Sequence, residues 1–248
     1  MTYMLRKAIT SEAKPLVGLY SESGGGKTHS ALLLACGYCN GDMSKVAMIE
    51  TEAGRGEAWA DDEVVGGYSV VPIRGNFAPK EYGEAISVVE KSDTRALIID
   101  SASHEWEGIG GVLSQAADNQ ANGSKGPIVW QKPKISHARA RSVGNVHRTP
   151  LVIGCMRAKY GMEQFDADDV RAHKEQRKPG KVPEIGDWFR SKDLSPKQSE
   201  DILFDMFVHG WLDKETHAFH GTKYTREAMR KIFIDGQPIT VDTGRRLA

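Results

Sequence analysis

The stretch Ser21-Glu22-Ser23-Gly24-Gly25-Gly26-Lys27-Thr28 lies between two apolar segments of different character. Residues 15–20 (PLVGLY) are short and almost wholly apolar, which is typical of a buried strand, whereas residues 27–39 are long enough for a helix. A glycine-rich turn between a strand and a helix brings backbone N–H groups together at the positive end of the helix dipole. The stretch therefore predicts an anion-binding loop in an α/β domain.

The residue types in this loop suit the phosphates of a nucleotide. Lys27 is expected to reach the β- and γ-phosphates, and the Thr28 hydroxyl is expected to bind Mg²⁺. Ser21 stands where such P-loops have their first glycine, which removes no ligand. A flexible turn that merely ends in Lys-Thr is the alternative. The predicted nucleotide-binding residues are Ser23, Gly24, Gly25, Gly26, Lys27, Thr28 and His29.

Two later strands end in carboxylates. Residues 96–100 (ALIID) place Asp100 where P-loop proteins hold Mg²⁺, and residues 46–50 run into Glu50 and Glu52. A carboxylate beside the γ-phosphate can deprotonate the attacking water. We predict that Glu52 has this catalytic role together with Lys27, that Glu50 is structural or supports Glu52 from behind, and that Glu105 is the alternative acid.

Short apolar runs alternate with helical patterns along the first two thirds of the chain, which predicts an α/β domain with a mostly parallel central sheet. We expect one domain over residues 1–248, with an N-terminal arm (1–14) and a mobile charged loop (163–192). Residues 198–248 are predicted to form a short antiparallel C-terminal β extension. The expected strands are residues 45–50, 68–73, 95–100, 150–155, 202–212 and 231–241, and the expected helices are residues 78–90, 109–117 and 129–146.

The composition is that of a globular protein, with 40% hydrophobic and 27% charged residues among 248. The sequence holds no apolar run of about 18 residues, so we expect no membrane span. Nor does it open with the apolar segment of a signal peptide. Its three cysteines argue against a disulfide framework and for a reducing cytoplasm. We predict that Cys36 and Cys39 are structural.

Opposite charges balance over the whole chain but are unevenly distributed along it. The 33 basic residues equal the 33 acidic ones, yet residues 119–162 contain no Asp or Glu and eight Lys or Arg. Basic side chains beside an aromatic ring suit phosphate contact and base stacking on single-stranded DNA. A solvated helix is the alternative. The residues expected to contact DNA are Lys125, Trp130, Lys132, Lys134, Arg139 and Arg141.

The order of these motifs resembles the RecA-type ATPase core, and more closely the core-only RecA-like ATPases of tailed phages, the Sak-type annealing and recombination group. The segments that carry the resemblance are the P-loop, Ile-Glu-Thr-Glu (49–52), Leu-Ile-Ile-Asp-Ser (97–101) and Val-Ile-Gly-Cys-Met-Arg (152–157). The resemblance implies a RecA-like P-loop fold, ATP and Mg²⁺ as ligands, and a homo-oligomer (filament or ring) acting on single-stranded DNA in the host cytoplasm.

The same resemblance assigns the catalytic glutamate to Glu52. Cys155 stands where RecA has its γ-phosphate-sensing glutamine, so the sensor role, or that of a cation acting in the neighbouring subunit, falls to Arg157 or Lys159. Two other functions stay open. One is a P-loop phosphotransferase on a small molecule, with residues 164–192 as its lid, and the other is a nucleotide-gated loader or assembly module.

Overall fold

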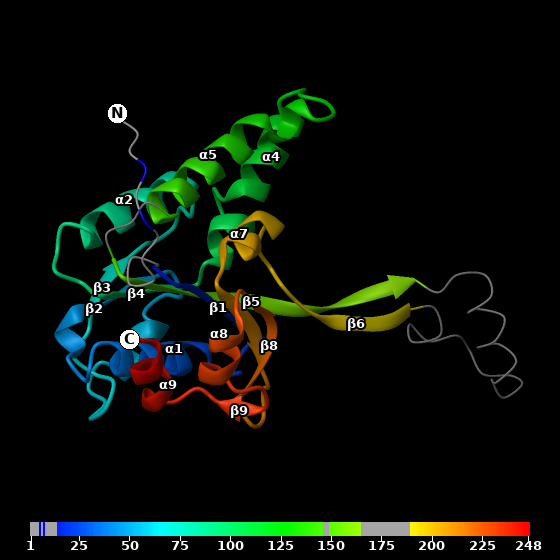
Figure 1. The fold of residues 1–248 in the computed structure, drawn as a ribbon. Coiled ribbons are helices and arrows are strands. Elements are labelled where there is room, and N and C mark those ends of the chain that lie inside the picture. Colours follow the sequence, from blue (N-terminus) through cyan, green and yellow to red (C-terminus); the bar gives the residue numbers. More distant parts are fainter. Residues whose placement is uncertain (1–4, 6, 8–13, 146–148, 165–188) are drawn as a thin grey trace, which may run out of the picture.

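The computed structural model describes residues 5, 7, 14–145, 149–164 and 189–248. Its centre is a sheet in the order β3-β2-β4-β5-β1-β7-β8-β9, with β6 paired to the outer part of β5 (Figure 1). The strands are β1 (Leu16–Ser21), β2 (Val46–Glu50), β3 (Ser69–Pro72), β4 (Ala96–Asp100), β5 (Leu151–Gln164), β6 (Phe189–Pro196), β7 (Val208–Leu212), β8 (Ala218–Tyr224) and β9 (Gln237–Pro238).

The strands from β3 to β7 in this order run parallel, and β8 and β9 join them antiparallel. The central strands are apolar on both faces because helices cover both, which is the usual composition of a parallel sheet. The predicted α/β fold with a mostly parallel sheet and antiparallel strands near the C-terminus is confirmed.

Helices lie on both faces of the sheet (Figure 1). One face carries α1 (Lys27–Tyr38), α8 (Glu227–Ile232) and α9 (Val241–Leu247), and the other carries α2 (Pro79–Val89), α5 (Ile128–Asn145) and α7 (Glu200–Asp205). Helices α1 and α9 touch backbone to backbone, because Gly37 and Gly244 leave no room for a Cβ between them. The helix that follows the glycine-rich loop is therefore held in place by the last helix of the described chain.

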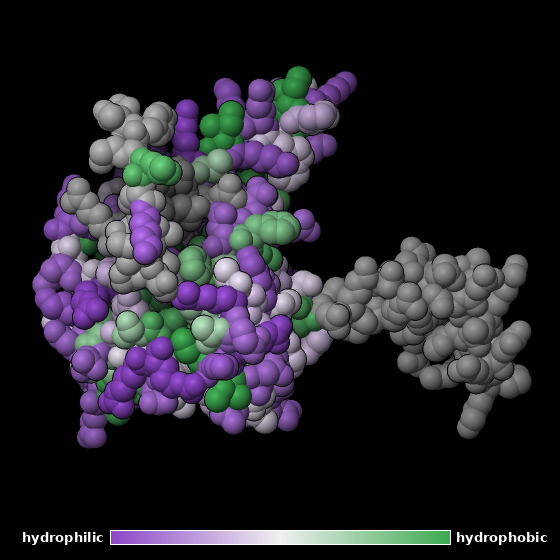
Figure 2. Space-filling view, viewed as in Figure 1, coloured by the Kyte–Doolittle hydropathy of each residue, from purple (hydrophilic) through white to green (hydrophobic). Residues whose placement is uncertain are grey.

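Two parts of the molecule project from this body (Figure 1). The first, which we call the arm, consists of α4 (Val112–Ala121), the turn 122–127 and the first half of α5. The second is the antiparallel ribbon of β5 and β6. Exposed apolar and hydrophilic residues alternate over the arm (Figure 2), with Ile128 66% and Ile135 47% exposed. The connections η2 (Met43–Lys45), η3 (Arg55–Trp59) and α3 (Ser103–Glu107) complete the described elements.

The prediction of a C-terminal β extension over residues 198–248 is wrong in part. Residues 202–205 belong to α7, where Glu200 and Asp201 occupy the first turn and favour a helix. Residues 231–241 contain the end of α8, the first residue of α9 and, as their only strand, the short β9. Strand β7 pairs parallel with β1 and so belongs to the central sheet, and β8 supplies the antiparallel pairing.

The predicted charged loop 163–192 is a strand at both of its ends, since β5 continues to Gln164 and β6 begins at Phe189. Residues 165–188 lie outside the described part of the chain, as does most of the predicted N-terminal arm 1–14. Within the described residues, no helix combines the length and apolar character needed to cross a bilayer.

Candidate functional site

A cleft of ≈ 610 Å³ opens at the carboxyl ends of the central parallel strands. This is the edge at which α/β proteins commonly bind ligands, because loops from several strands meet there. The cleft brings together most of the residues predicted to bind or hydrolyse a nucleotide. Its lining comprises Ser21, Ser23, Gly24, Gly26, Lys27, Thr28, His29, Glu52, Arg55, Trp59, Asp100, Glu107, Arg157, Ala158, Lys159 and Lys197.

The glycine-rich loop (residues 21–26) needs its glycines for different reasons. Gly24 and Gly26 have φ of 84° and 78°, which side chains rarely tolerate. Gly25 lies against the Ser21 side chain, where a Cβ would collide, and it is not part of the cleft lining. The loop therefore presents backbone at the start of α1, where N–H groups can bind an anion.

Lys27 bends over this loop. Its Nζ donates hydrogen bonds to the carbonyl oxygens of Glu22 at 2.8 Å and Ser21 at 3.2 Å, and to Ser21 Oγ at 3.2 Å. Burial lowers the pKa of Lys27, and the nearby Asp100 and Glu52 act against this shift. An anionic ligand in the cleft would add to that stabilisation of the ammonium.

Thr28 and Asp100 meet at the floor of the cleft. Thr28 Oγ1 donates a hydrogen bond to Asp100 Oδ2 at 2.5 Å. Burial raises the pKa of Asp100 to about 6, with the Thr28 hydrogen bond opposing the rise. A hydroxyl and a carboxylate in contact are hard oxygen ligands, and Mg²⁺ typically binds such a pair while keeping several waters. This donor set fits the predicted magnesium site.

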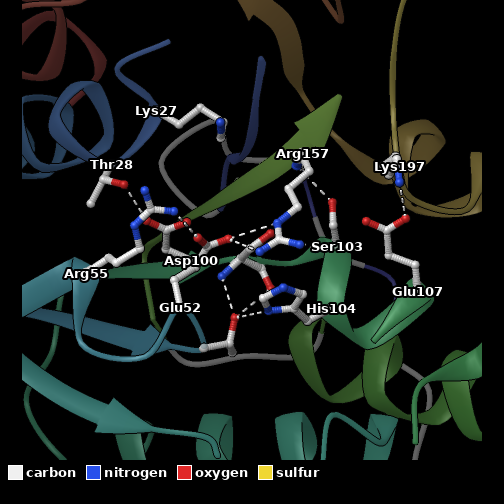
Figure 3. A network of polar contacts seen from close by, with 12 residues as sticks. Lys27, Thr28, Glu52, Arg55, Asp100, Ser103, His104, Glu107, Arg157 and Lys197 are labelled. Atoms are coloured by element: carbon white, nitrogen blue, oxygen red, sulfur yellow. Dashed lines mark hydrogen bonds and ion pairs between the residues drawn. The ribbon is translucent and has the colours of Figure 1, made fainter. Parts of the chain in front are cut away.

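Glu52 faces Arg157 across the cleft (Figure 3). Arg157 donates from Nε at 3.0 Å and from Nη2 at 2.9 Å, both to Glu52 Oε1. Arg55 approaches the other oxygen, Oε2, at 3.4 Å. Glu52 is only 16% exposed, so the ion pair with Arg157 is partly shielded from water. The predicted general base thus has arginine contacts at both carboxylate oxygens.

Glu50 is structural, as predicted. Its fully buried carboxylate accepts hydrogen bonds from the backbone N–H groups of Glu52 at 2.6 Å and Gly54 at 3.1 Å, and pairs with Arg74 at 2.6 Å. A buried carboxylate needs such partners. These contacts fix the turn after β2 and with it the backbone of Glu52.

Between the two glutamates, Thr51 ties β2 to the end of β4. Its Oγ1 accepts a hydrogen bond from Ser101 N at 2.8 Å and shares one with His104 Nδ1 at 2.7 Å. Ser103 Oγ in turn accepts a hydrogen bond from Arg157 N at 2.9 Å. The short helix α3 therefore fixes the backbones on both sides of the Glu52–Arg157 pair (Figure 3).

Among the lining residues that sequence reasoning missed, four have charged or aromatic side chains. Trp59 stacks on His29 with ring centroids 4.4 Å apart, which gives one end of the cleft an aromatic wall. Lys197 pairs with Glu107 at 2.5 Å on another side, and Arg55 lies beside Glu52. Arg55, Trp59 and Glu107 lie seven or fewer residues beyond Glu52 or Asp100, so a search of the segments after each carboxylate strand would have found them.

Two sequence-predicted candidates lie elsewhere. Cys155 is fully buried beneath the cleft with its Sγ 3.7 Å from the Lys27 carbonyl oxygen, so it is not among the lining residues. The alternative acid Glu105 is buried away from the cleft, where both its oxygens lie 2.9 Å from His137 Nδ1. His137 Nε2 contacts Ser199 Oγ at 2.8 Å. This contact chain joins α3, α5 and α7 and excludes Glu105 from contact with a ligand in the cleft.

The residues predicted to contact DNA belong to the arm and to α5 rather than to the cleft. Lys125, Lys132 and Lys134 are exposed, while Trp130 is half-buried beside a surface hollow that Lys134 also lines. Arg139 lies farther along α5, exposed, and Arg141 lies on the same helix with its side chain outside the described part of the structure. Five of the six therefore lie on α5, and Lys125 lies in the turn before it.

Cys36 and Cys39 are buried in the core around α1, and burial raises both thiol pKa values, that of Cys39 to about 11. Each Sγ lies against a backbone carbonyl oxygen, that of Val64 or that of Lys45. Among the residues that the structure describes, no group of three or more His, Cys, Asp or Glu side chains is arranged to hold a metal. These contacts agree with the predicted structural role of both cysteines.

No protein-family model matches this chain, and a comparison with curated proteins finds no significant match.

Proposed function

We propose that this protein is a RecA-like P-loop ATPase that binds and hydrolyses ATP with Mg²⁺ and couples hydrolysis to single-stranded DNA in phage recombination or annealing. The observation that carries the proposal is the contact of Thr28 with Asp100 in a cleft that also holds Lys27 and Glu52. Phosphate binding, metal binding and water activation need these residue types within reach of one ligand.

Each group has a separate task in this mechanism. The backbone N–H groups at the start of α1 and the Lys27 ammonium hold the phosphates. Thr28 and Asp100 hold Mg²⁺, which, when bound, offsets the charge that develops on the phosphate oxygens. Glu52 orients the attacking water and accepts its proton. Trp59 with His29 offers an aromatic surface for the base.

The DNA part of the proposal rests on the arm. Its exposed lysines would contact phosphates, and Trp130 and Ile128 would offer apolar surface to unstacked bases. We further propose a homo-oligomer in which Lys159, exposed at the rim of the cleft, is the candidate cation for a neighbouring subunit's nucleotide. Arg157 is the less suitable of the two because it already pairs with Glu52 of its own chain.

A nucleotide-gated loader or assembly module is the second candidate. The observation that favours it is the ion pair of Glu52 with Arg157, since a carboxylate so engaged cannot activate water. Such a module would bind ATP tightly and turn it over very slowly.

Measuring ATP hydrolysis with and without single-stranded DNA, at two salt concentrations, tests the proposal. We expect turnover that DNA stimulates and that weakens as salt rises. A Lys27→Ala variant should lose at least about a hundredfold in rate, as when a charge-stabilising group is removed. Binding without turnover supports the second candidate, and turnover that DNA leaves unchanged rules out the coupling.

A further inference from the structure

The ion pair between Glu52 and Arg157 has a defined geometry. Glu52 follows β2 and Arg157 lies on β5, so the two side chains reach toward one another from opposite walls of the cleft (Figure 3). The guanidinium presents two nitrogens to one carboxylate oxygen, at 2.9 and 3.0 Å. A two-nitrogen contact of this kind is stronger and more directional than a single contact.

This geometry conflicts with water activation. A general base must direct a lone pair at the water whose proton it removes. Here Glu52 Oε1 accepts from Arg157 and Oε2 lies next to Arg55. The carboxylate must therefore leave Arg157 before it can act on water.

A third phosphate in the cleft would supply the competitor that this release requires. A γ-phosphate carries more negative charge than a carboxylate and accepts two parallel N–H bonds from a guanidinium. Arg157 is 43% exposed, so its side chain has room to turn, while its backbone N–H stays bound to Ser103 Oγ. A diphosphate lacks the terminal group that would attract Arg157.

We propose that Arg157 is a positioning residue that holds Glu52 inactive until a γ-phosphate withdraws the guanidinium, so that the site becomes competent only with a nucleoside triphosphate. This rests on the proposed function. It assigns Arg157 to the nucleotide of its own subunit. The second candidate function is then explained as the resting state of the first.

The test measures binding, in Mg²⁺ buffer by calorimetry, of ADP and of a non-hydrolysable ATP analogue. In the unaltered protein, triphosphate binding must break the Glu52–Arg157 pair. Glu52→Gln removes the competing charge, so this variant should bind the analogue about three- to tenfold more tightly, within the range of coupling measured for contacting residues. Arg157→Ala should bind the analogue about tenfold more weakly. ADP affinity should change by less than about twofold in each variant.

We call the hold of Arg157 on Glu52 the clamp. The double variant Glu52→Gln with Arg157→Ala distinguishes this clamp from independent effects of the two residues on binding. Without Arg157 there is no cation to release, so Glu52→Gln should no longer improve analogue binding in the Arg157→Ala background. Arg157→Lys keeps the charge but loses the two-nitrogen contact, so it should fall between the unaltered protein and Arg157→Ala. Because lysine is a smaller change than alanine, Arg157→Lys also keeps the test valid if Arg157→Ala disturbs folding.

Arg55→Ala is the matched control, because Arg55 approaches the same carboxylate at 3.4 Å from a 72% exposed position. Exposed pairs are weak, so this variant should change the preference for the analogue over ADP by less than about twofold. If Glu52→Gln brings no gain, or if its gain persists without Arg157, the clamp is wrong although the nucleotide site stands. If neither nucleotide binds the unaltered protein, the proposed function is wrong and the clamp with it.

Discussion

The cleft and the arm hold their charged side chains in different ways. In the cleft, Asp100 at the end of β4 contacts Thr28 at the start of α1, and Glu52 contacts Arg157 on β5. On the arm, Lys125, Lys132 and Lys134 are exposed and form no ion pair with another described residue. Fixed geometry suits chemistry, which depends on tenths of an ångström, whereas loosely held cations suit a flexible polyanion that is bound at many points. Substitutions in the two regions should therefore have effects of different size and on different properties.

The largest effect is expected in the cleft. Glu52→Gln removes the general base, so ATP hydrolysis should fall about 10²- to 10⁴-fold. Glu57→Gln is the control, because Glu57 is exposed outside the cleft and should leave the rate within about twofold. A Glu52→Gln variant that keeps a tenth of the rate would shift the base role to another group.

The contact chain at the base of the arm comes next. His137→Ala would leave Glu105 buried without its partner, so the free energy of unfolding should fall by about 3 kcal/mol. Urea unfolding measures this. His220→Ala, which removes a half-buried ring stacked on Trp211, should cost less than about 1 kcal/mol. Equal losses in the two variants would mean that His137 only fills space.

Asp100 is the proposed magnesium ligand, but burying its carboxylate lowers the stability of the fold. Its pKa of about 6 lies above the unfolded value of 3.8, so the folded carboxyl binds its proton more tightly and stability falls as pH rises between these values. Asp100→Asn should therefore raise the free energy of unfolding by about 1–3 kcal/mol at pH 8, a gain that disappears below about pH 4. Thermal unfolding across this range measures it. Mg²⁺-dependent hydrolysis should be lost in the same variant, and a stability that does not change would place the carboxylate in a more hydrated setting.

The smallest effects are expected on the arm. Lys132→Gln with Lys134→Gln should weaken single-stranded DNA binding several-fold and reduce its dependence on the logarithm of salt concentration by about 0.7 per lysine. Stability should change by less than about 0.5 kcal/mol, since both side chains are exposed. Fluorescence anisotropy over a salt series measures the binding. Lys80→Gln, on exposed α2 surface, is the control, and an equal loss there would remove the arm from the DNA surface.

Sequence reasoning succeeded for the central strands around the cleft and failed for parts that lie farther from it. The central strands were predicted correctly, with Asp100 at the end of β4 and Glu52 shortly after β2, because a parallel sheet needs unbroken apolar runs and ends them at one edge. The prediction of one strand over residues 202–212 was wrong because the apolar residues there belong to two elements, α7 and β7. The spacing of apolar residues alone does not separate a short helix from a short strand. The β5–β6 ribbon was missed because a ribbon that projects from the body needs no apolar pattern.

The partnerships within the site could not be predicted. Glu52 and Arg157 are each recognisable as functional residues, but their contact joins β2 and β5, and the sequence holds no measure of the distance between them. The same holds for Lys197 with Glu107, and for His137 with Glu105 and Ser199. Such pairs depend on how elements pack, which local propensity does not encode.

The contact between α1 and α9 bears on how the molecule is made. Gly37 and Gly244 lie 244 − 37 = 207 positions apart, so at the usual 5–20 residues per second a ribosome needs about 10–40 s to travel from one to the other. During that interval the nascent chain exposes the side of α1 that α9 later covers. The glycine-rich loop emerges early but receives its last support late, so the nascent chain has a period in which a chaperone could shield it.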